Sequence, residues 1–149
     1  MKIINLKLNE DYLNLKKIDK RGLVAAIGNF DGLHIGHKRL LNEAKKEAKN
    51  KNLPFAIITF NPHPREFFSK DKVGFKITDN LEKQRLIRNF KTEILIQVLF
   101  NEQLRNLNPN DFIEKILKKT LNVKLLFAGV NFRFGKNRSG SLIDAKAQF

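Results

Sequence analysis

Five short apolar segments, each about as long as a β-strand, are the feature that most constrains how this 149-residue chain can fold. The middle three are almost continuously apolar, whereas a strand with one solvent-exposed face alternates apolar and polar residues. Continuous apolar strands are typical of a parallel sheet that is covered on both faces. The five segments are Ile3-Ile4, Leu23 to Ile27, Phe55 to Phe60, Ile94 to Phe100 and Val123 to Ala128.

Amphipathic helical patterns lie between these segments. One covers His37 to Lys51, and a second opens at a capping box formed by Asp79 and Glu82. A third opens at Asn108-Pro109, an N-cap followed by proline in the first turn. The expected inward residues are Leu40, Leu41, Ala44 and Ala48 in the first helix, Leu81, Leu86, Ile87 and Phe90 in the second, Phe112, Ile113, Ile116 and Leu117 in the third, and Tyr12, Leu13 and Ile18 in an earlier helix.

The alternation of strands and helices predicts an α/β fold with a Rossmann-like, doubly wound parallel sheet in a single domain. A ligand of such a sheet lies beyond the carboxyl ends of the strands. Three polar loops follow predicted strands and should converge there: Gly28 to Gly36, Asn61 to Asp79, and Gly129 to Gly140.

The net charge of +14 comes from lysines and arginines spread along the whole chain, not gathered in one arm. We interpret it as compositional bias combined with attraction for anionic small molecules, and do not expect a nucleic-acid or membrane partner. An RNA-binding or membrane-surface role is the alternative. The chain has no cysteine and its N-terminus lacks a signal-peptide pattern, which together fit a cytoplasmic protein. The sequence does not determine the oligomeric state, and a homo-oligomer is compatible with it.

The first loop carries the strongest chemical signal. His34 and His37 stand three residues apart where a predicted strand passes into a helix, with Gly36 between them. Helix N-termini attract anions, and two imidazoles held there could donate hydrogen bonds to a reacting phosphate. Gly36 has no side chain, so a flat base could approach the backbone. Asp31 could cap the helix, orient a histidine or hold a metal through water.

The second loop, Asn61 to Phe68, combines rigidity with anion recognition. Prolines on both sides of His63 stiffen it, Arg65 could bind a phosphate in fork geometry, and its aromatic residues could pack on a ring system. The alternative is a rigid loop whose aromatic side chains rejoin the core. No second ligand lies at a useful spacing from His63, so we assign no metal to it.

The third loop, Gly129 to Gly140, alternates glycine with basic and aromatic residues. Asn131 and Arg133 could line a polyphosphate or a flavin. Stacking of single-stranded RNA, or a plain surface loop, are the alternatives. The acidic residues form no metal-binding or acid–base pair, the glycine–lysine spacing does not match a P-loop, and no Ser–His–Asp arrangement is indicated.

Together, the segments GNFDGLHIGH, TFNPHPREFF and GVNFRFGKNRSG, in this order, resemble the bacterial bifunctional riboflavin kinase/FMN adenylyltransferase family, the prokaryotic FAD synthetases. The spacer FNEQLRNLNPNDFI also resembles that family, so the likeness runs from about Gly22 to Gly140. It implies the fold of the HIGH-motif nucleotidyltransferases. It further implies transfer of AMP from ATP to FMN, giving FAD and pyrophosphate, with Mg2+.

The resemblance also implies roles for individual residues. His34 and His37 would contact the ATP phosphates, Gly36 would lie beneath the adenine, and many relatives carry aspartate where this chain has Asn131. The implied catalytic residues are His34, His37, Asn131 and Arg133. The implied ATP-binding residues are Gly28, Asn29, Phe30, Asp31, Gly32, His34, Gly36 and His37. The implied flavin-binding residues are Asn61, Pro62, His63, Pro64, Arg65, Phe132, Phe134 and Gly135, with no protein metal ligand assigned.

The chain departs from the family at its carboxyl end. The family's adenylyltransferase domain continues into a serine/threonine-rich motif ending in arginine and then into a riboflavin kinase domain, and the sequence ends at Phe149 before either. The resemblance therefore implies a truncated adenylyltransferase domain over residues 1–149, with little FAD synthesis and no riboflavin phosphorylation. The alternatives are another HIGH-motif nucleotidyltransferase, against which the PHPREFF segment argues, and an RNA-binding module related to class I aminoacyl-tRNA synthetases.

Overall fold

The computed structural model describes residues 1–8, 18–61, 80–129, 132–134 and 140–141. Within these residues no helix is long and apolar enough to cross a membrane. The elements are, in chain order, β1 (Lys2–Leu6), β2 (Leu23–Ile27), α1 (Ile35–Lys51), β3 (Phe55–Asn61), α3 (Asn80–Asn89), β4 (Ile94–Leu99), α4 (Glu102–Arg105), α5 (Pro109–Asp111), η2 (Phe112–Thr120), β5 (Val123–Ala128), β6 (Arg133–Phe134) and β7 (Gly140–Ser141).

Five strands form one sheet in the order β1-β4-β3-β2-β5, and every pair in it is parallel. From β2 the chain winds outward through β3 to β4, and it then returns to the other side of β2 to form β5. The strand order therefore reverses at β2, and the carboxyl ends of β2 and β5 flank the position where open α/β sheets bind ligands. The predicted doubly wound α/β sheet is confirmed.

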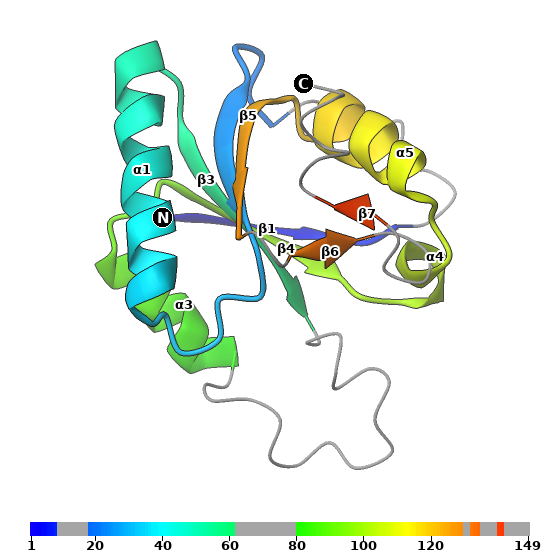
Figure 1. The fold of residues 1–149 in the computed structure, drawn as a ribbon, viewed down its shortest axis with the longest axis horizontal. Helices are drawn as coiled ribbons and strands as arrows, with labels where there is room; N and C mark the ends of the chain where they lie inside the picture. Colours follow the sequence, from blue (N-terminus) through cyan, green and yellow to red (C-terminus); the bar gives the residue numbers. More distant parts are fainter. Residues whose placement is uncertain (9–17, 62–79, 130–131, 135–139, 142–149) are drawn as a thin grey trace.

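Helices cover both faces of the sheet, so the fold has three layers (Figure 1). Helices α1 and α3 lie on one side, and α4, α5 and η2 lie on the other. Side chains of β2 alternate between the two layers: Val24 and Ala26 join the cluster around α1, and Leu23, Ala25 and Ile27 join the cluster that includes η2. All five are buried, which explains why this strand is apolar throughout.

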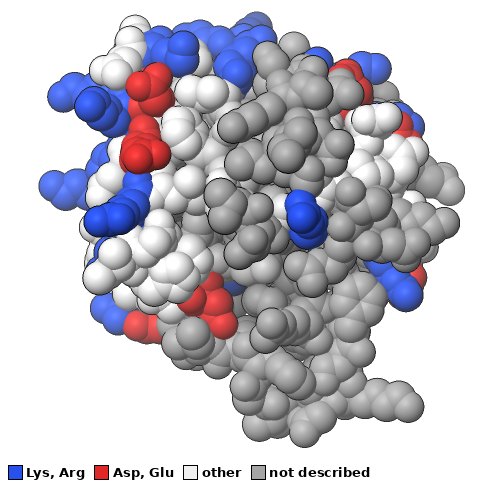
Figure 2. Space-filling view, viewed as in Figure 1, with Lys and Arg blue, Asp and Glu red and all other residues white. Residues whose placement is uncertain are grey.

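Among the described residues, the Lys and Arg side chains on the face drawn in Figure 2 do not gather in a single patch. Lys and Arg side chains lie over several separate parts of this face, with many on the side formed by α1, and acidic side chains lie among them. On α1 the exposed Lys46 and Lys49 follow the exposed Glu43. For the described residues of this face, the distribution fits the interpretation of the charge as spread out.

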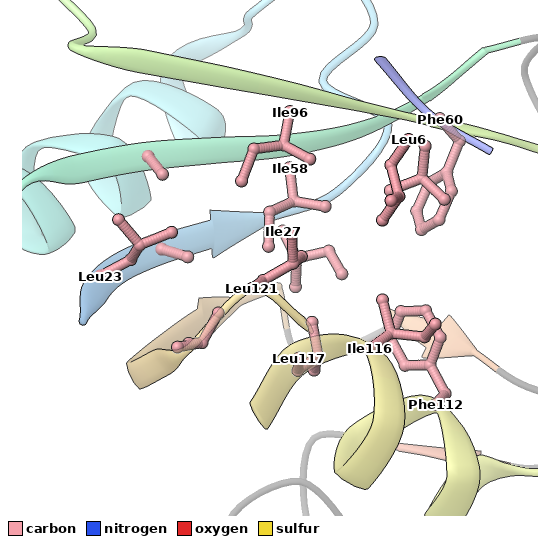
Figure 3. Packing of buried hydrophobic residues seen from close by; sticks show 14 of the residues in the cluster. Leu6, Leu23, Ile27, Ile58, Phe60, Ile96, Phe112, Ile116, Leu117 and Leu121 are labelled. Atoms are coloured by element: carbon pink, nitrogen blue, oxygen red, sulfur yellow. The ribbon is translucent and has the colours of Figure 1, made fainter. Parts of the chain in front are cut away.

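The first and third predicted helices are confirmed. Helix α1 begins at Ile35, two residues earlier than expected, and it buries Leu41, Ala44 and Ala48 as predicted. The Asn108 side chain accepts a hydrogen bond from the backbone N–H of Asp111 at 2.8 Å, with proline next in the first turn. The chain continues into η2, a helix of π type that buries Phe112, Ile113, Ile116, Leu117 and Thr120. Figure 3 shows this apolar side of η2 facing the sheet.

The second predicted helix is confirmed, with Ile87 buried as predicted, but its inward face does not include Leu81. Leu81 was expected to be buried, but 77% of it is exposed. The buried residues are Lys83 and Ile87, which stand one helical turn apart, and Leu81 lies two residues before Lys83, on nearly the opposite side. Leu86 and Phe90, which were predicted to face inward, are partly buried against the core. Asp79 of the predicted capping box lies outside the described residues, as do Tyr12 and Leu13.

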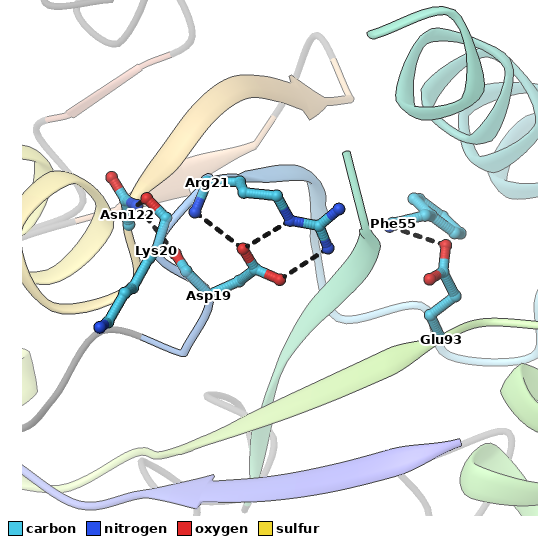
Figure 4. Close-up of polar contacts among 6 residues, drawn as sticks. All are labelled: Asp19, Lys20, Arg21, Phe55, Glu93 and Asn122. Atoms are coloured by element: carbon cyan, nitrogen blue, oxygen red, sulfur yellow. Dashed lines mark hydrogen bonds and ion pairs between the residues drawn. The ribbon is translucent and has the colours of Figure 1, made fainter. Parts of the chain in front are cut away.

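Hydrogen bonds fasten the amino ends of the strands (Figure 4). Asn122, immediately before β5, is buried in a left-handed conformation with φ of 56°. Its side-chain amide donates to the backbone oxygens of Asp19 at 2.9 Å and Lys20 at 3.3 Å, in the segment that leads into β2. A Glu93 carboxylate oxygen accepts from the backbone N–H of Phe55 at 3.1 Å, which links the starts of β4 and β3. The fastening contacts thus lie away from the carboxyl ends that face the predicted ligand.

We predict that Asn122→Ala lowers the free energy of unfolding by about 1–3 kcal/mol, because two backbone carbonyls lose their amide donor and alanine disfavours the left-handed conformation. Asn122→Gly removes the same hydrogen bonds without the conformational strain, so it should be less destabilising than alanine. Urea unfolding followed by circular dichroism measures both. A change below 0.5 kcal/mol for Asn122→Ala, on the order expected for surface substitutions, would contradict the fastening role.

Candidate active site

Core packing holds the loop between β2 and α1. Phe30 and Leu33 adopt left-handed backbone conformations, with φ of 48° and 43°, yet they are only 2% and 5% exposed. Both belong to the apolar cluster under α1, so burial of their side chains offsets the cost of an unfavourable backbone. A Cβ on Gly28 would lie 3.1 Å from the Phe30 ring, so glycine at position 28 gives that ring room. The loop shape is therefore fixed by the core beneath it.

His34 is the N-cap of α1. Its Nδ1 accepts a hydrogen bond from the backbone N–H of His37 at 3.4 Å, and the two imidazoles stack with centroids 3.6 Å apart and 21° between their planes. A Cβ on Gly36 would lie 3.1 Å from Cε1 of His34. Gly36 therefore allows the His34 ring to fold back over the first turn of the helix. The sequence predicts room for a flat base beside Gly36, and in this structure the His34 ring lies there.

The surroundings of His37 change its pKa and leave one of its ring nitrogens unpaired. Partial burial lowers the pKa of His37, the neighbouring His34 lowers it further, and Asp31 opposes both effects. Its ring packs edge-on against Phe30 with centroids 5.3 Å apart. The Nδ1 atom of His37 is buried without a hydrogen-bond partner, and so is Oδ1 of Asn29 in the same loop. Buried polar atoms are rarely left unpaired, so these two atoms mark places where a ligand could bind.

An aromatic cluster joins the carboxyl ends of three strands on the η2 side of the sheet. Phe60 from β3 stacks with Phe132, which follows β5, with ring centroids 6.3 Å apart and 15° between planes. Phe60 also meets Phe100, which follows β4, edge-on at 6.3 Å. The structure thus brings Phe132 to the same sheet edge as the His34 loop, as predicted. Arg133 is exposed in β6, which pairs antiparallel with β7, and Phe134 lies opposite Gly140 in that ribbon.

Several predicted site residues lie outside the described residues. These are Pro62, His63, Pro64, Arg65, Asn131 and Gly135. Asn61, the last residue of β3, is described, and its backbone oxygen accepts from the N–H of Phe100 at 3.2 Å. The prediction that the second and third loops share one crevice is therefore supported by Phe132 and remains a prediction for His63.

A polar pocket that was not predicted from the sequence lies at the carboxyl ends of β1, β3 and β4. The pocket has a volume of about 420 Å3. The residues that line it are Asn5, Leu6, Lys7, Asn61, Asn80, Gln84, Gln97 and Leu99. One signal could have revealed it: Gln97 is the single polar residue in the otherwise apolar strand β4. Its amide is nevertheless 4% exposed, and it bonds to Asn80 and Gln84 of α3.

The described part of the chain contains no group of three or more His, Cys, Asp or Glu residues that could hold a metal by itself. Asp31 is the carboxylate of the loop after β2, and it acts on the charge of His37. Mg2+ is usually held by one or two carboxylates together with substrate phosphates and water. The donor set in this loop therefore fits a magnesium ion that arrives with a nucleotide.

Comparison with known proteins places the chain in one family. The sequence model of FAD synthetase matches residues 16–148. Bifunctional riboflavin kinase/FMN adenylyltransferases are similar: that of Buchnera aphidicola subsp. Schizaphis graminum is 37% identical over 92% of this chain and 44% of the relative. The Escherichia coli K12 protein is 36% identical over 93% of this chain and 44% of the relative, and the Bacillus subtilis 168 protein is 37% identical over 87% and 41%.

A crystal structure of a macrolide-efflux protein from Streptococcus pneumoniae superposes with a TM-score of 0.78 and 25% identity, covering 98% of this chain and 47% of that one. This likeness agrees with the α/β architecture described above. The chain spans less than half the length of the curated relatives it matches. The loop after β2 holds the His34–His37 pair at the start of a helix. Because the family model also matches residues 16–148, the chain belongs to the FAD synthetase family.

Proposed function

We propose that the chain is an FMN adenylyltransferase unit, which transfers AMP from ATP to FMN and releases FAD and pyrophosphate. The observation that carries this proposal is the His34–His37 pair stacked over the first turn of α1, with a buried, unpartnered Nδ1 on His37. Such a site, at the reversal of the strand order, suits a nucleotide phosphate. The names of the relatives supply FMN as the acceptor. Residues 1–149 would form the adenylyltransferase part of such a protein.

The chemistry requires alignment and charge neutralisation more than proton removal. A phosphate oxygen of FMN attacks the α-phosphorus of ATP, and the bond from that phosphorus to the bridging oxygen breaks as pyrophosphate leaves. The nucleophile is already anionic, so no general base is needed. The protein would hold the two phosphates in line and stabilise the negative charge of the transition state. His34, His37 and Arg133 are the described residues suited to this, with Asn131 added by resemblance.

When the nucleotide binds, His37 would gain a proton and His34 would move. With its pKa lowered, His37 is mainly neutral in the free protein at pH 7. A nearby polyphosphate would raise that pKa and favour the protonated ring, which donates from both nitrogens. His34 would have to leave its position beside Gly36 before a flat base could occupy it. One hydrogen bond of 3.4 Å and one stacking contact oppose that movement, which makes it inexpensive.

Mg2+ would reach the site with the phosphates of ATP. Asp31 is the described residue that would hold it, directly or through water, and the ion would neutralise phosphate charge. For the flavin, we propose the residues that resemblance implies. Of these, Asn61 and Phe132 are described at the carboxyl edge of the sheet. The Phe60–Phe132 stack offers an apolar wall at this edge that suits a planar ring.

The proposal is tested by FAD formation from FMN and MgATP, followed by chromatography. The assay uses the chain extended through the family's serine/threonine–arginine motif, because residues 1–149 alone are expected to show little FAD synthesis. We expect His37→Ala to lower the rate about 100- to 1000-fold, which is the loss found for one donor to a transition-state charge. Its circular dichroism should match that of the unchanged protein. Lys49→Ala, an exposed change at the far end of α1, is the matched control and should leave the rate unaltered. An undiminished rate in His37→Ala would refute the phosphate role.

The lowered pKa of His37 also predicts a pH dependence of stability. Because its pKa is lower in the folded protein than in the unfolded chain, the unfolded chain binds this proton first as the pH falls below about 6.5. The contribution of His37 is therefore fully present above that pH, and is lost as the pH falls toward the folded pKa. Urea unfolding at pH 7.5 and 5.5 should show a smaller loss of stability in His37→Gln than in the unchanged protein. Equal losses would contradict the prediction.

A further inference from the structure

The amino ends of the five parallel strands carry a row of basic side chains. In the order in which the strands lie in the sheet, the row consists of Lys2 on β1, Lys91 ahead of β4, Lys51 ahead of β3, Arg21 ahead of β2 and Lys124 on β5. All five residues are exposed. Adjacent strands lie about 4.8 Å apart, so the row extends over roughly 20 Å. These residues are far apart in the sequence, and the parallel sheet brings them together at one edge, which we call the amino edge.

Helix ends add positive charge on both sides of the row. Because α1, α3 and η2 each lead into the start of a strand, their last turns lie at the amino edge. The basic residues exposed in these last turns are Lys49 of α1, Arg88 of α3 and Lys119 of η2. Figure 2 shows this edge in profile along the upper and left margins of the view, where many of the drawn Lys and Arg side chains lie. The row is therefore flanked by cations on both faces of the sheet.

Interaction with helix dipoles explains part of this charge. Basic residues in a last turn are favourable because the carboxyl end of a helix is negative, which accounts for Lys51 and for the flanking helix ends. Lysines on edge strands also discourage pairing with another sheet, which suits Lys2 on β1 and Lys124 on β5. Neither explanation covers Arg21, or the alignment of one cation with each of the five strands.

Two acidic residues stand beside the row, and both are engaged in structural contacts (Figure 4). Asp19 accepts from the Arg21 guanidinium at 3.2 and 3.0 Å and from the Arg21 backbone N–H at 2.8 Å. Glu93 accepts from the backbone N–H of Phe55. Within the described residues, no carboxylate forms an ion pair with a lysine of the row. The charges of these lysines are therefore available to an anionic partner.

Two cations of the row are held in place by their neighbours. The carboxylate of Asp19 fixes the Arg21 guanidinium through two hydrogen bonds. Gly22, with φ of 107°, gives room to the stem of Lys124, because a Cβ at position 22 would lie 2.4 Å from Cγ of Lys124. Side chains that are already ordered lose less conformational entropy when they bind a partner. The amino edge is thus partly preorganised for binding.

The surroundings of the row favour a rigid, linear polyanion over a membrane or a single strand. Helices that bind membrane surfaces insert apolar side chains, and proteins that bind single-stranded nucleic acid stack aromatic rings on bases. Within the described residues, the exposed large hydrophobic side chains are Ile35 and Leu81, which lie in the first turns of α1 and α3, at the opposite edge. Phe55, which begins β3 beside the row, is buried. The described part of the amino edge therefore offers charge without apolar anchors.

We propose that the amino edge binds the phosphate backbone of a nucleic-acid duplex without reading its bases. The cations of the row would lie against successive phosphates, and lysine is a compact charge suited to this role. The nucleotide site of the proposed function lies at the carboxyl edge, so a duplex and ATP would bind at the same time. The proposal therefore stands or falls independently of FMN adenylyl transfer.

Fluorescence anisotropy of a labelled DNA duplex of about 20 base pairs tests the proposal. We expect a Kd of about 1–100 μM near physiological salt, the range of sequence-independent binding. A plot of log Kd against log salt concentration should have a slope of about 4 to 5, because roughly five phosphate contacts each release about 0.9 counterion. A second duplex of unrelated sequence should bind equally, since the bases are not read.

The triple variant Lys51→Gln/Lys91→Gln/Lys124→Gln removes three charges of the row and keeps side chains of similar length. We expect binding to weaken by about 10- to 100-fold and the slope to fall by about 3. Circular dichroism checks that the variant folds. If it does not, the single variants Lys91→Gln and Lys124→Gln replace it, and each should lower the slope by about 1.

The matched control is Lys7→Gln/Lys38→Gln/Lys46→Gln, which removes the same net charge from exposed positions away from the amino edge. It should keep the slope of the unchanged protein and weaken binding by less than about threefold, because phosphate contacts set the salt dependence. Equal weakening by the control and by the triple variant would show that only net charge matters, and would overturn the proposal.

Three further outcomes would also overturn the proposal. One is the absence of duplex binding at about 50 mM salt, where sequence-independent binding is strong. Another is displacement of the duplex by MgATP at constant ionic strength, which would place the duplex at the nucleotide site. The third is tighter binding to vesicles that contain anionic phosphatidylglycerol, lost in the triple variant, which would assign the amino edge to a membrane surface.

Discussion

The interior position of β2, paired in parallel with β3 on one side and with the edge strand β5 on the other, is the constraint on which the rest of the structure depends. Both faces of this strand are covered, so its five residues are all apolar and all buried. Because β2 and β5 are parallel neighbours, the loops that follow them emerge at the same edge of the sheet, at the position where the strand order reverses. The candidate active site is a consequence of that winding.

The loop after β2 shows how a rigid core can hold reactive side chains near the surface. Phe30 and Leu33 are anchored beneath α1 in left-handed conformations, and the helix starts immediately after them. This places His34 and His37 over the first turn, where the backbone N–H groups and the helix dipole attract an anion. In the free protein, His34 occupies part of that position as the cap of the helix. The start of the helix is therefore already in place, but its N-cap side chain lies where we propose that the nucleotide binds.

The two faces of the sheet differ at the carboxyl edge. The η2 side ends in the rings of Phe60, Phe100 and Phe132, whereas the α3 side ends in the amides of Gln97 and its partners. Helix packing explains the division, since η2 presents an apolar side and α3 turns Lys83 rather than Leu81 inward. A ligand above this edge would meet apolar contacts on one side and hydrogen-bonding groups on the other.

The sequence by itself determined the five strands of the parallel sheet, the two helices α1 and η2 with most of their buried residues, the position of the histidine pair and the family. Each of these depends on local periodicity, capping or a contiguous motif. Only the tertiary structure decided the rotation of α3, the folding of His34 over Gly36, the contact of Phe60 with Phe100 and Phe132, and the meeting of Gln97 with Asn80 and Gln84. Those features join residues from separate elements. They depend on how helices rotate and pack on the sheet, which local sequence patterns do not encode.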